Sequence, residues 1–265
     1  MVRLPISRFW GRMMRLDVFL SENGYARSRT EAKGYITGGL VIVNGKVERK
    51  PSFDVLDGSD ITVDKSAKRY VSRGGLKLEA ALDAFGVSVK ERLCLDIGAS
   101  SGGFTDCLLK RGAGHVIAVD SGFGQMNSSL KNDSRVTVIE NYNARFMKRC
   151  DLEYTPSLTV MDVSFISATY IFPSIKDCMQ KGGDFICLIK PQFEVGRSGL
   201  GKGGIVKDEK IRKSAVDKVM LSAASLGFEL FGLIESPILG GDGNTEFLAH
   251  FKIGDKDFEK SDNNT

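Results

Sequence analysis

The stretch LCLDIGASSGGFT, residues 93–105, has the pattern of a buried strand, a tight turn and the start of a helix. The apolar strand ends in an acid, Asp96, and the glycines that follow let the backbone turn sharply and let a ligand approach it closely. Asp120, 22 residues after Gly98, ends the next strand, where a carboxylate can accept hydrogen bonds from ribose hydroxyl groups. The stretch therefore indicates an α/β fold with a glycine-rich turn at the carboxyl end of a strand.

The spacing of this turn leaves four interpretations open. A dinucleotide site has weak support, because the turn reads GxSxGG and not GxGxxG. A hydrolase would use Ser100 in the pattern GxSxG, with Asp162 or Asp242 followed by His250 in the required order. An S-adenosylmethionine site accounts for the acids at the ends of both strands together, which the hydrolase pattern does not. The fourth interpretation is a glycine turn that serves the fold alone.

After Leu76 the chain alternates between apolar stretches and helical ones. Strands are expected at residues 93–96, 116–120, 136–140, 158–162, 185–190, 228–234 and 246–253. This alternation predicts an open, mostly parallel, doubly wound Rossmann-like sheet. Because the last strand follows a glycine-rich turn, we expect it to be an antiparallel strand at the edge of the sheet. The charged tail, residues 255–265, is expected to be flexible.

Residues 14–64 have a different pattern and are expected to form a small α+β domain. Two short helices are predicted, the second over residues 26–32 with Ser28 as its cap. Asn44-Gly45 between β-forming residues predicts a hairpin. Arginines on the helices give this unit the layout of a small RNA-binding domain. The polar, basic residues 65–75 are expected to link it to a main domain at residues 76–254.

Composition excludes several classes of protein. Hydrophobic residues at 42% and charged residues at 26% are ordinary for a soluble globular chain and exclude disorder throughout. Five scattered cysteines indicate free thiols in a reducing compartment, and two histidines argue against a zinc site, so we expect no metal. With no apolar stretch of about 20 residues and no signal-peptide core, we expect a cytoplasmic protein that does not span a membrane.

The positive charge is concentrated near the start of the chain. Residues 1–70 hold 13 Lys and Arg against 8 Asp and Glu, a balance of +5, whereas residues 71–265 hold 24 against 25, a balance of −1. A basic head on a neutral body favours a polyanionic partner such as nucleic acid, although an excess of this size also occurs in ordinary proteins.

Four charged residues stand at positions where chemistry is possible. Asp162 and Lys190 each close an apolar strand, and the carboxyl ends of parallel strands form the ligand crevice of such sheets. Lys77 lies on a helix beside a ledge of alanines, and Glu246 opens the last strand after the glycine-rich turn. Each also has a plainer interpretation, since a strand-end charge often marks emergence into water and a helix lysine is usually solvated.

Four segments in order, GASSGGFT, MDVSFIS, LIKPQFEVG and GNTEFLAH, resemble the TlyA (hemolysin A) family of bacterial ribosomal RNA methyltransferases. The catalytic domain of that family is similar to the FtsJ ribose methyltransferases. The segment MRLDVFLSENGYARSRTEAKGYITGGLVIVNG resembles the alpha-L RNA-binding domain first described in a small-subunit ribosomal protein. The resemblance extends over about residues 14–253, leaves residues 1–13 without a counterpart, and implies a class I methyltransferase sheet.

The resemblance also implies roles for individual residues. It implies a catalytic tetrad of Lys77, Asp162, Lys190 and Glu246. The residues implied or expected to hold S-adenosylmethionine are Asp96, Gly98, Ala99, Ser100, Ser101, Gly102, Gly103, Phe104, Asp120, Asn143 and Asp162. Those expected to contact RNA phosphates are Arg15, Arg27, Arg29, Lys33, Lys46, Arg49, Lys50 and Arg69. The partner is then ribosomal RNA or a ribosomal subunit.

The expected reaction is 2′-O-methylation of a cytidine ribose in ribosomal RNA. A lysine can take the hydroxyl proton only where burial or a second cation lowers its pKa, so Lys190 is expected as the base and Lys77 as that cation. Asp162 is expected to orient both lysines, and Glu246 to hold the far side of the network. The alternatives are a membrane-active cytolysin, as the older family name invites, a catalytically silent ribosome-binding module, and an esterase that uses Ser100.

Overall fold

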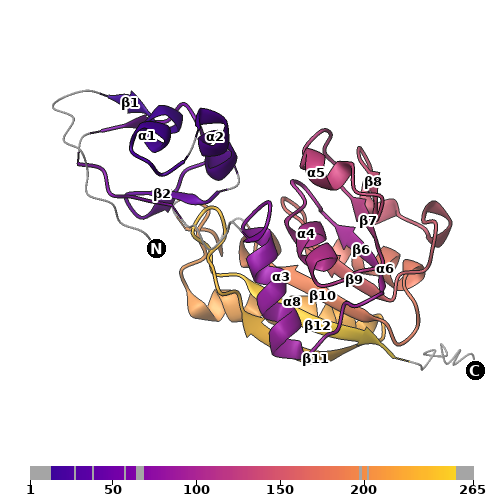
Figure 1. Ribbon diagram of the computed structural model, residues 1–265. Helices are drawn as coiled ribbons and strands as arrows, with labels where there is room; N and C mark the ends of the chain where they lie inside the picture. The colour runs from indigo at the N-terminus through magenta and orange to yellow at the C-terminus, as the bar shows by residue number, and fades with distance from the viewer. Residues whose placement is uncertain are drawn as a thin grey trace, which may run out of the picture.

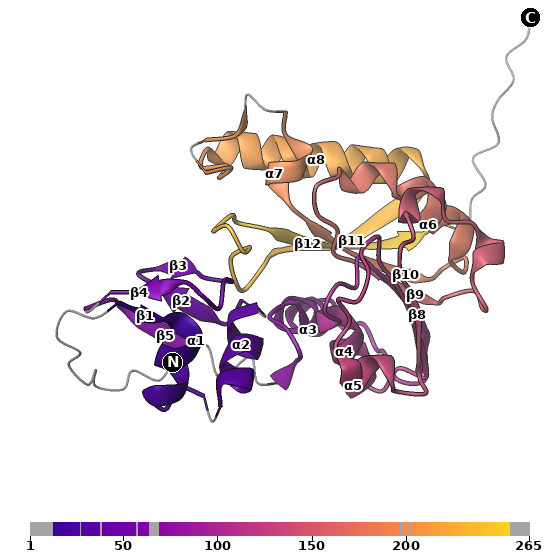
Figure 2. The same cartoon turned by 90° about the horizontal axis from the view of Figure 1, so that it is seen from above.

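The computed structural model describes residues 13–26, 28–37, 39–56, 58–63, 69–196, 199–201 and 203–254. Figure 1 shows a small head, formed by the first part of the chain, beside a larger domain built on one sheet. Figure 2 shows this sheet between two layers of helices, so the larger domain has three layers. No helix in these ranges is long and apolar enough to cross a membrane.

The sheet of the larger domain has seven strands in the order β11-β12-β10-β9-β6-β7-β8. Their bounds are β6 Leu93–Ile97, β7 His115–Val119, β8 Val136–Ile139, β9 Leu158–Met161, β10 Asp184–Ile189, β11 Phe228–Glu235 and β12 Phe247–Ile253. Neighbours from β10 to β8 pair in parallel, whereas β12 pairs antiparallel with both β10 and β11. The predicted doubly wound α/β sheet is confirmed, with each strand within two residues of its expected bounds.

One expectation about the sheet was wrong. β12 is antiparallel as expected, but it lies between β10 and β11, and β11 is the edge strand. The burial of side chains explains this order. Five of the seven residues of β12 are buried, which suits an interior strand, while β11 exposes alternate residues to solvent.

Helices cover both faces of the sheet (Figure 2). One face carries α3 (Gly74–Phe85), α4 (Gly103–Lys110) and α5 (Ser128–Lys131), and the other carries α6 (Phe172–Cys178), α7 (Pro191–Glu194) and α8 (Glu209–Ser225). Short 3-10 helices lie at η2 (Ala144–Phe146), η3 (Arg149–Asp151) and η4 (Ala168–Tyr170). Each face has its own apolar core, and burial of these side chains is the main force that holds the layers together.

The head has two helices, α1 (Leu16–Glu22) and α2 (Arg29–Thr37), packed on small strands. The strands are β1 (Met14–Arg15), β2 (Val41–Val43), β3 (Lys46–Val47), β4 (Asp54–Val55) and β5 (Ile61–Val63), paired as β1-β4 and β3-β2-β5. The predicted hairpin is confirmed, since Asn44 and Gly45 have φ of 50° and 78°. Ser28 caps α2 as expected by accepting from the Glu31 amide at 3.1 Å, but the helix runs from Arg29 and is longer than predicted.

The linker is docked on the larger domain. The described part of the expected linker, residues 65–75, starts at Arg69, and its last two residues already belong to α3. Tyr70 is buried and donates to Glu79 at 3.0 Å, and the Val71 amide donates to Asp106 at 2.8 Å. These contacts fix the start of α3, the helix that carries Lys77.

Candidate active site

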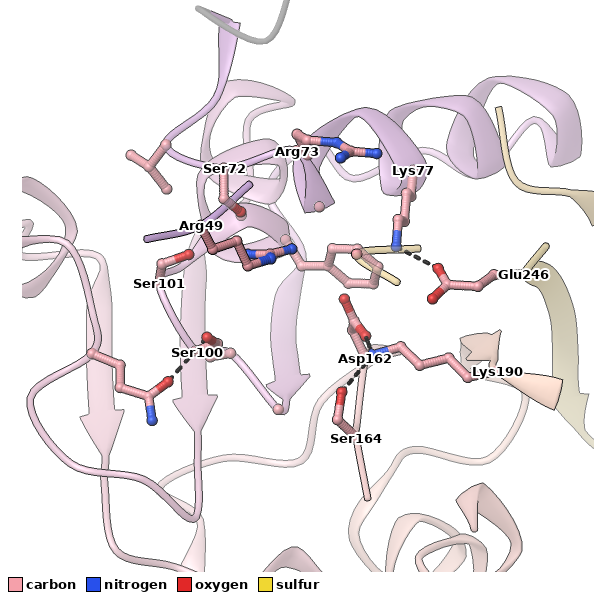
Figure 3. A pocket seen from close by; sticks show the side chains of 18 of the residues that line it. Arg49, Ser72, Arg73, Lys77, Ser100, Ser101, Asp162, Ser164, Lys190 and Glu246 are labelled. Carbon is pink, nitrogen blue, oxygen red and sulfur yellow. Dashed lines mark hydrogen bonds and ion pairs between the residues drawn. The ribbon is translucent and has the colours of Figure 1, made fainter. Parts of the chain in front are cut away.

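A crevice of about 800 Å³ lies at the carboxyl ends of the parallel strands. Its walls are formed by the turn after β6, the loops after β9 and β10, the loop before β12, the first turn of α3, and part of the head (Figure 3). A second cavity of about 480 Å³ adjoins it and shares Gly98, Ser100 and Asp162 with it. The two cavities therefore meet at the turn after β6 and the end of β9.

The four residues of the implied tetrad all line the crevice, as two ion pairs (Figure 3). Lys77 Nζ pairs with Glu246, and Lys190 Nζ lies 2.6 Å from Asp162 Oδ1. Lys190 also donates to Ser164 Oγ at 2.7 Å. The expectation that Asp162 contacts both lysines was wrong, since Asp162 forms an ion pair with Lys190 while Lys77 pairs with Glu246.

Burial distinguishes this cluster from ordinary surface charges. Lys77 is 8% exposed and Glu246 is 2% exposed. Lys77 is therefore not an ordinary solvated helix lysine, and Glu246 is not a carboxylate at a solvent-exposed strand end. A charge is buried in a protein at acceptable cost only when it is paired and hydrogen-bonded. Gly240 matters here, because a side chain at that position would collide with the Glu246 carboxylate.

The turn after β6 depends on its glycines. Gly98 has φ of 81°, and any side chain there would collide with the carbonyl of Asp162, so the turn packs directly on the end of β9. Ser100 also has positive φ, at 48°, and its amide donates to Asp120 Oδ2 at 2.7 Å. The Gly122 amide donates to the other oxygen of Asp120 at 2.6 Å. The carboxylate therefore ties the turn after β6 to the loop after β7.

The expected cofactor residues fall into three groups. Those that line the crevice are Gly98, Ala99, Ser100, Ser101, Gly103, Phe104 and Asp162. Asp120, directly after β7, and Asn143, after β8, line the adjoining cavity. Asp96 and Gly102 line neither cavity.

Asp96 is fully buried and connects β6 to α4. Its Oδ2 accepts a hydrogen bond from Thr105 Oγ1 at 2.6 Å. Burial raises the pKa of Asp96 to about 7, in spite of the hydrogen bond from Thr105, which favours the charged form. This residue therefore holds the strand and the helix on either side of the glycine-rich turn.

A residue that sequence reasoning missed supports the loop after β9. Glu194, 6% exposed at the end of α7, accepts from Ser167 Oγ at 2.5 Å and from the Ala168 amide at 2.8 Å. Lys218 lies 3.5 Å away on α8. Asp162 and Ser164, the two partners of Lys190, belong to the same loop as Ser167. The bonds from Glu194 therefore steady the loop that carries both partners. The signal was a carboxylate within the apolar segment PQFEVG.

The basic residues of the head and linker are not gathered in one place. Arg15 and Arg29 hold the buried Asp17 at 3.0 and 2.9 Å, and Arg69 pairs with Glu79 at 2.5 Å. Lys33, Lys46, Arg49 and Lys50 are all exposed, and of these four Arg49 lines the crevice. Arg27 lies outside the described residues.

The esterase interpretation was wrong, because its residues are bonded elsewhere. Ser100 Oγ bonds to Gln125 Oε1 at 3.1 Å. His250 Nε2 bonds to Asp184 at 2.7 Å, and His250 is buried in β12 and lines neither the crevice nor the adjoining cavity. Ser100 therefore has no histidine base at its side in this structure.

Comparison with known proteins agrees with this geometry. Residues 70–253 match the family model of the FtsJ-like methyltransferases, and residues 14–61 match that of the S4 domain. The chain is 44% identical to Hemolysin A of Brachyspira hyodysenteriae over 91% of this chain and 100% of that one. It is 43% identical to the 16S/23S rRNA (cytidine-2′-O)-methyltransferase TlyA of Mycobacterium tuberculosis over 89% of each chain.

A solved structure of a Streptococcus thermophilus protein named as a hemolysin is 42% identical to this chain. It matches 92% of this chain and 90% of its own length with a TM-score of 0.74. The chain belongs to the TlyA (hemolysin A) family of FtsJ-like methyltransferases, and it carries an S4 domain as its head.

Proposed function

We propose that this methyltransferase uses S-adenosylmethionine to methylate the 2′-hydroxyl of a cytidine in ribosomal RNA. The observation that carries the proposal is the cluster of two lysines and two carboxylates beside the glycine-rich turn, in which Lys77 and Glu246 are buried and Lys190 and Asp162 are partly buried. The printed name of the Mycobacterium tuberculosis relative supplies the nucleotide, the position on the ribose and the two ribosomal RNAs. By the same reasoning, the protein works in the cytoplasm, where ribosomal subunits are found.

The two adjoining cavities fit S-adenosylmethionine in size and in chemistry. The glycine-rich turn, with Gly98 at positive φ, leaves backbone exposed to a ligand where side chains would fill the space. Asp120 would accept the ribose hydroxyls of the cofactor, and Asn143 would lie beside its adenine. When bound, the cofactor supplies the methyl group as an electrophile on a sulfonium sulfur. Asp96 would not touch the cofactor but would hold the glycine-rich turn between β6 and α4 in shape.

The residues of the chain handle the proton of the attacking hydroxyl. Lys190 Nζ would accept the proton of the ribose hydroxyl as the hydroxyl oxygen attacks the methyl group that the bound cofactor would supply. Lys190 must be neutral to accept it, so its extra proton leaves to solvent beforehand, and Asp162, at 2.6 Å, holds the Nζ in position. Ser164 fixes the direction of the Lys190 side chain. Lys77 and Glu246 line the same crevice and would orient the ribose. Alignment of well-oriented reactants contributes roughly 7–11 kcal/mol to such reactions.

The head would bring the RNA to this crevice. Phosphate contacts from its exposed lysines and arginines would give affinity and a strong dependence on salt, but little sequence information. Folded RNA is recognised largely by shape, which favours a ribosomal RNA helix or a whole subunit as the substrate.

A methyl-transfer assay tests the proposal. Purified protein is incubated with labelled S-adenosylmethionine and, separately, with free ribosomal RNA, small subunits and large subunits, beside a Lys190→Ala control. We expect label in RNA that survives alkali as a dinucleotide, because a 2′-O-methyl group blocks cleavage of the adjacent phosphodiester. Label that alkali releases entirely as single nucleotides, or equal transfer by the control, would refute ribose methylation by this site.

A further inference from the structure

The head contributes a cation to the catalytic crevice. Gly34, Thr37 and Arg49 of the head line the same crevice as the two lysine–carboxylate pairs (Figure 3). Among the described basic residues of the head, Arg49 is the one that lines it. Lys77 and Lys190 are neutralised by their carboxylates, whereas the hydrogen bond of Arg49, at 3.3 Å, goes to the neutral carbonyl of Thr37. Among the residues that the structure describes, no carboxylate forms an ion pair with the Arg49 guanidinium.

Two glycines make room for the Arg49 guanidinium. A side chain at Gly39, in the turn before β2, would come within 3.0 Å of Arg49 Cζ. A side chain at Gly241, in the loop before β12, would come within 2.9 Å of Arg49 Nη2. The guanidinium therefore lies in a slot formed by the head on one side and the larger domain on the other.

A second arginine contacts the same turn of the head. Arg73 Nη1 donates to the carbonyl of Gly39 at 2.9 Å, and Arg73 Nη2 donates to the carbonyl of Leu239 at 2.7 Å. Arg73 thus ties the turn of the head to the loop that leads to Glu246, and both arginines line the crevice. A guanidinium matches a phosphate with two parallel hydrogen bonds, so the arginine that faces the crevice suits an anion of this kind.

We propose that Arg49, in this slot beside Arg73, binds the phosphate group adjacent to the ribose that is methylated. This assignment rests on the proposed function, since the anion is a phosphodiester of the RNA substrate. The 3′ carbon that carries the phosphodiester neighbours the 2′ carbon, so a ribose held at Lys190 brings a phosphate into the same crevice. Because the slot needs both domains, the phosphate site forms only when the head is docked on the larger domain.

The test separates alignment of the substrate from its binding. Single-turnover methylation is measured with enzyme in saturating excess over RNA, RNA affinity by titration, and cofactor affinity by calorimetry. Arg49→Ala is expected to lower the single-turnover rate about 10- to 100-fold, the effect of losing a hydrogen bond to a charged group. Cofactor affinity is expected to stay within twofold of that of the unchanged protein. Lys213→Ala, which removes a charge from the exposed side of α8, serves as the matched control.

A second variant keeps the positive charge of Arg49 but shifts the position of its guanidinium. Gly241→Ala places a methyl group against the end of the Arg49 side chain, which is flexible and can shift without disturbing the backbone. We expect Gly241→Ala to lower the single-turnover rate in the same direction as Arg49→Ala, with RNA affinity less affected. Rates within twofold of the unchanged protein for both variants would overturn the phosphate site alone. Absence of RNA methylation by the unchanged protein would instead refute the proposed function.

Discussion

Lys77 and Glu246 are 169 residues apart in the sequence, yet they form a buried ion pair at the wall of the crevice. One lies on the helix that follows the linker, and the other directly precedes β12, the last strand of the fold. The pair therefore joins the first and last elements of the larger domain. The pair forms only when these two elements have come together, so its presence indicates that the active site is complete.

Breaking this pair is expected to be costly, because the remaining charge would be buried without a partner. We predict that Lys77→Met lowers the free energy of unfolding by about 3–5 kcal/mol, and that adding Glu246→Leu recovers most of the loss. Both variants are expected to be inactive in methyl transfer. Chemical denaturation and the transfer assay measure the two effects. Full activity in the double variant would show that the pair serves only stability.

Glu194 is expected to act on catalysis through the loop after β9. Glu194→Ala leaves the Ala168 amide and Ser167 hydroxyl without their acceptor, at a cost of about 1–3 kcal/mol in stability, and frees the loop that holds Asp162 and Ser164. We predict a fall of about tenfold in kcat with little change in KM for RNA. Glu194→Gln, which keeps one acceptor oxygen, is expected to restore part of the rate.

The control for this prediction is Glu209→Ala, an exposed carboxylate at the start of α8. Steady-state kinetics of the three variants decide the matter. A kcat for Glu194→Ala equal to that of the unchanged protein would remove Glu194 from any role in positioning the site.

The buried Asp96 predicts a particular dependence of stability on pH. Its pKa is raised to about 7 in the folded protein, against about 3.9 in an unfolded chain, so the folded state binds more protons between these values. The free energy of unfolding should therefore fall as pH rises from about 4 to 7, by up to about 1.4 kcal/mol per pH unit from this group. In Asp96→Asn this contribution is absent, while the bond to Thr105 remains possible.

Urea unfolding of both proteins across this pH range measures the difference. We expect Asp96→Asn to gain stability relative to the unchanged protein as pH rises, and the gain to level off above about pH 7. Parallel pH profiles for the two proteins would contradict a raised pKa for Asp96.

The strands were predictable from the sequence because buried parallel strands read as apolar runs that end in a turn or a charge. β9 and β10 show this clearly, since Asp162 and Lys190 mark their ends. The place of β12 was not predictable in this way. Its antiparallel direction follows from the turn before it, but its insertion between β10 and β11 depends on packing across both faces of the sheet.

For the site, residue types and strand ends predicted which residues would come together but not how they would pair. The sequence has no feature that tells whether Asp162 contacts one lysine or both, because that depends on the position of α3 relative to the sheet. Glu194 was missed for a related reason, since its partners, Ser167 and the Ala168 amide, belong to a loop 26 or more residues earlier. Arg49 was expected to meet RNA, but its place in the crevice depends on how the head docks.

The identity of the methylated nucleoside is the most direct test of the account. RNA labelled by the protein is digested to nucleosides, which are separated and identified by mass, with Lys190→Ala run in parallel. The account predicts that the label resides in 2′-O-methylcytidine and that the variant produces none. Label in a base-methylated nucleoside, or 2′-O-methylcytidine formed at an undiminished rate by Lys190→Ala, would contradict it.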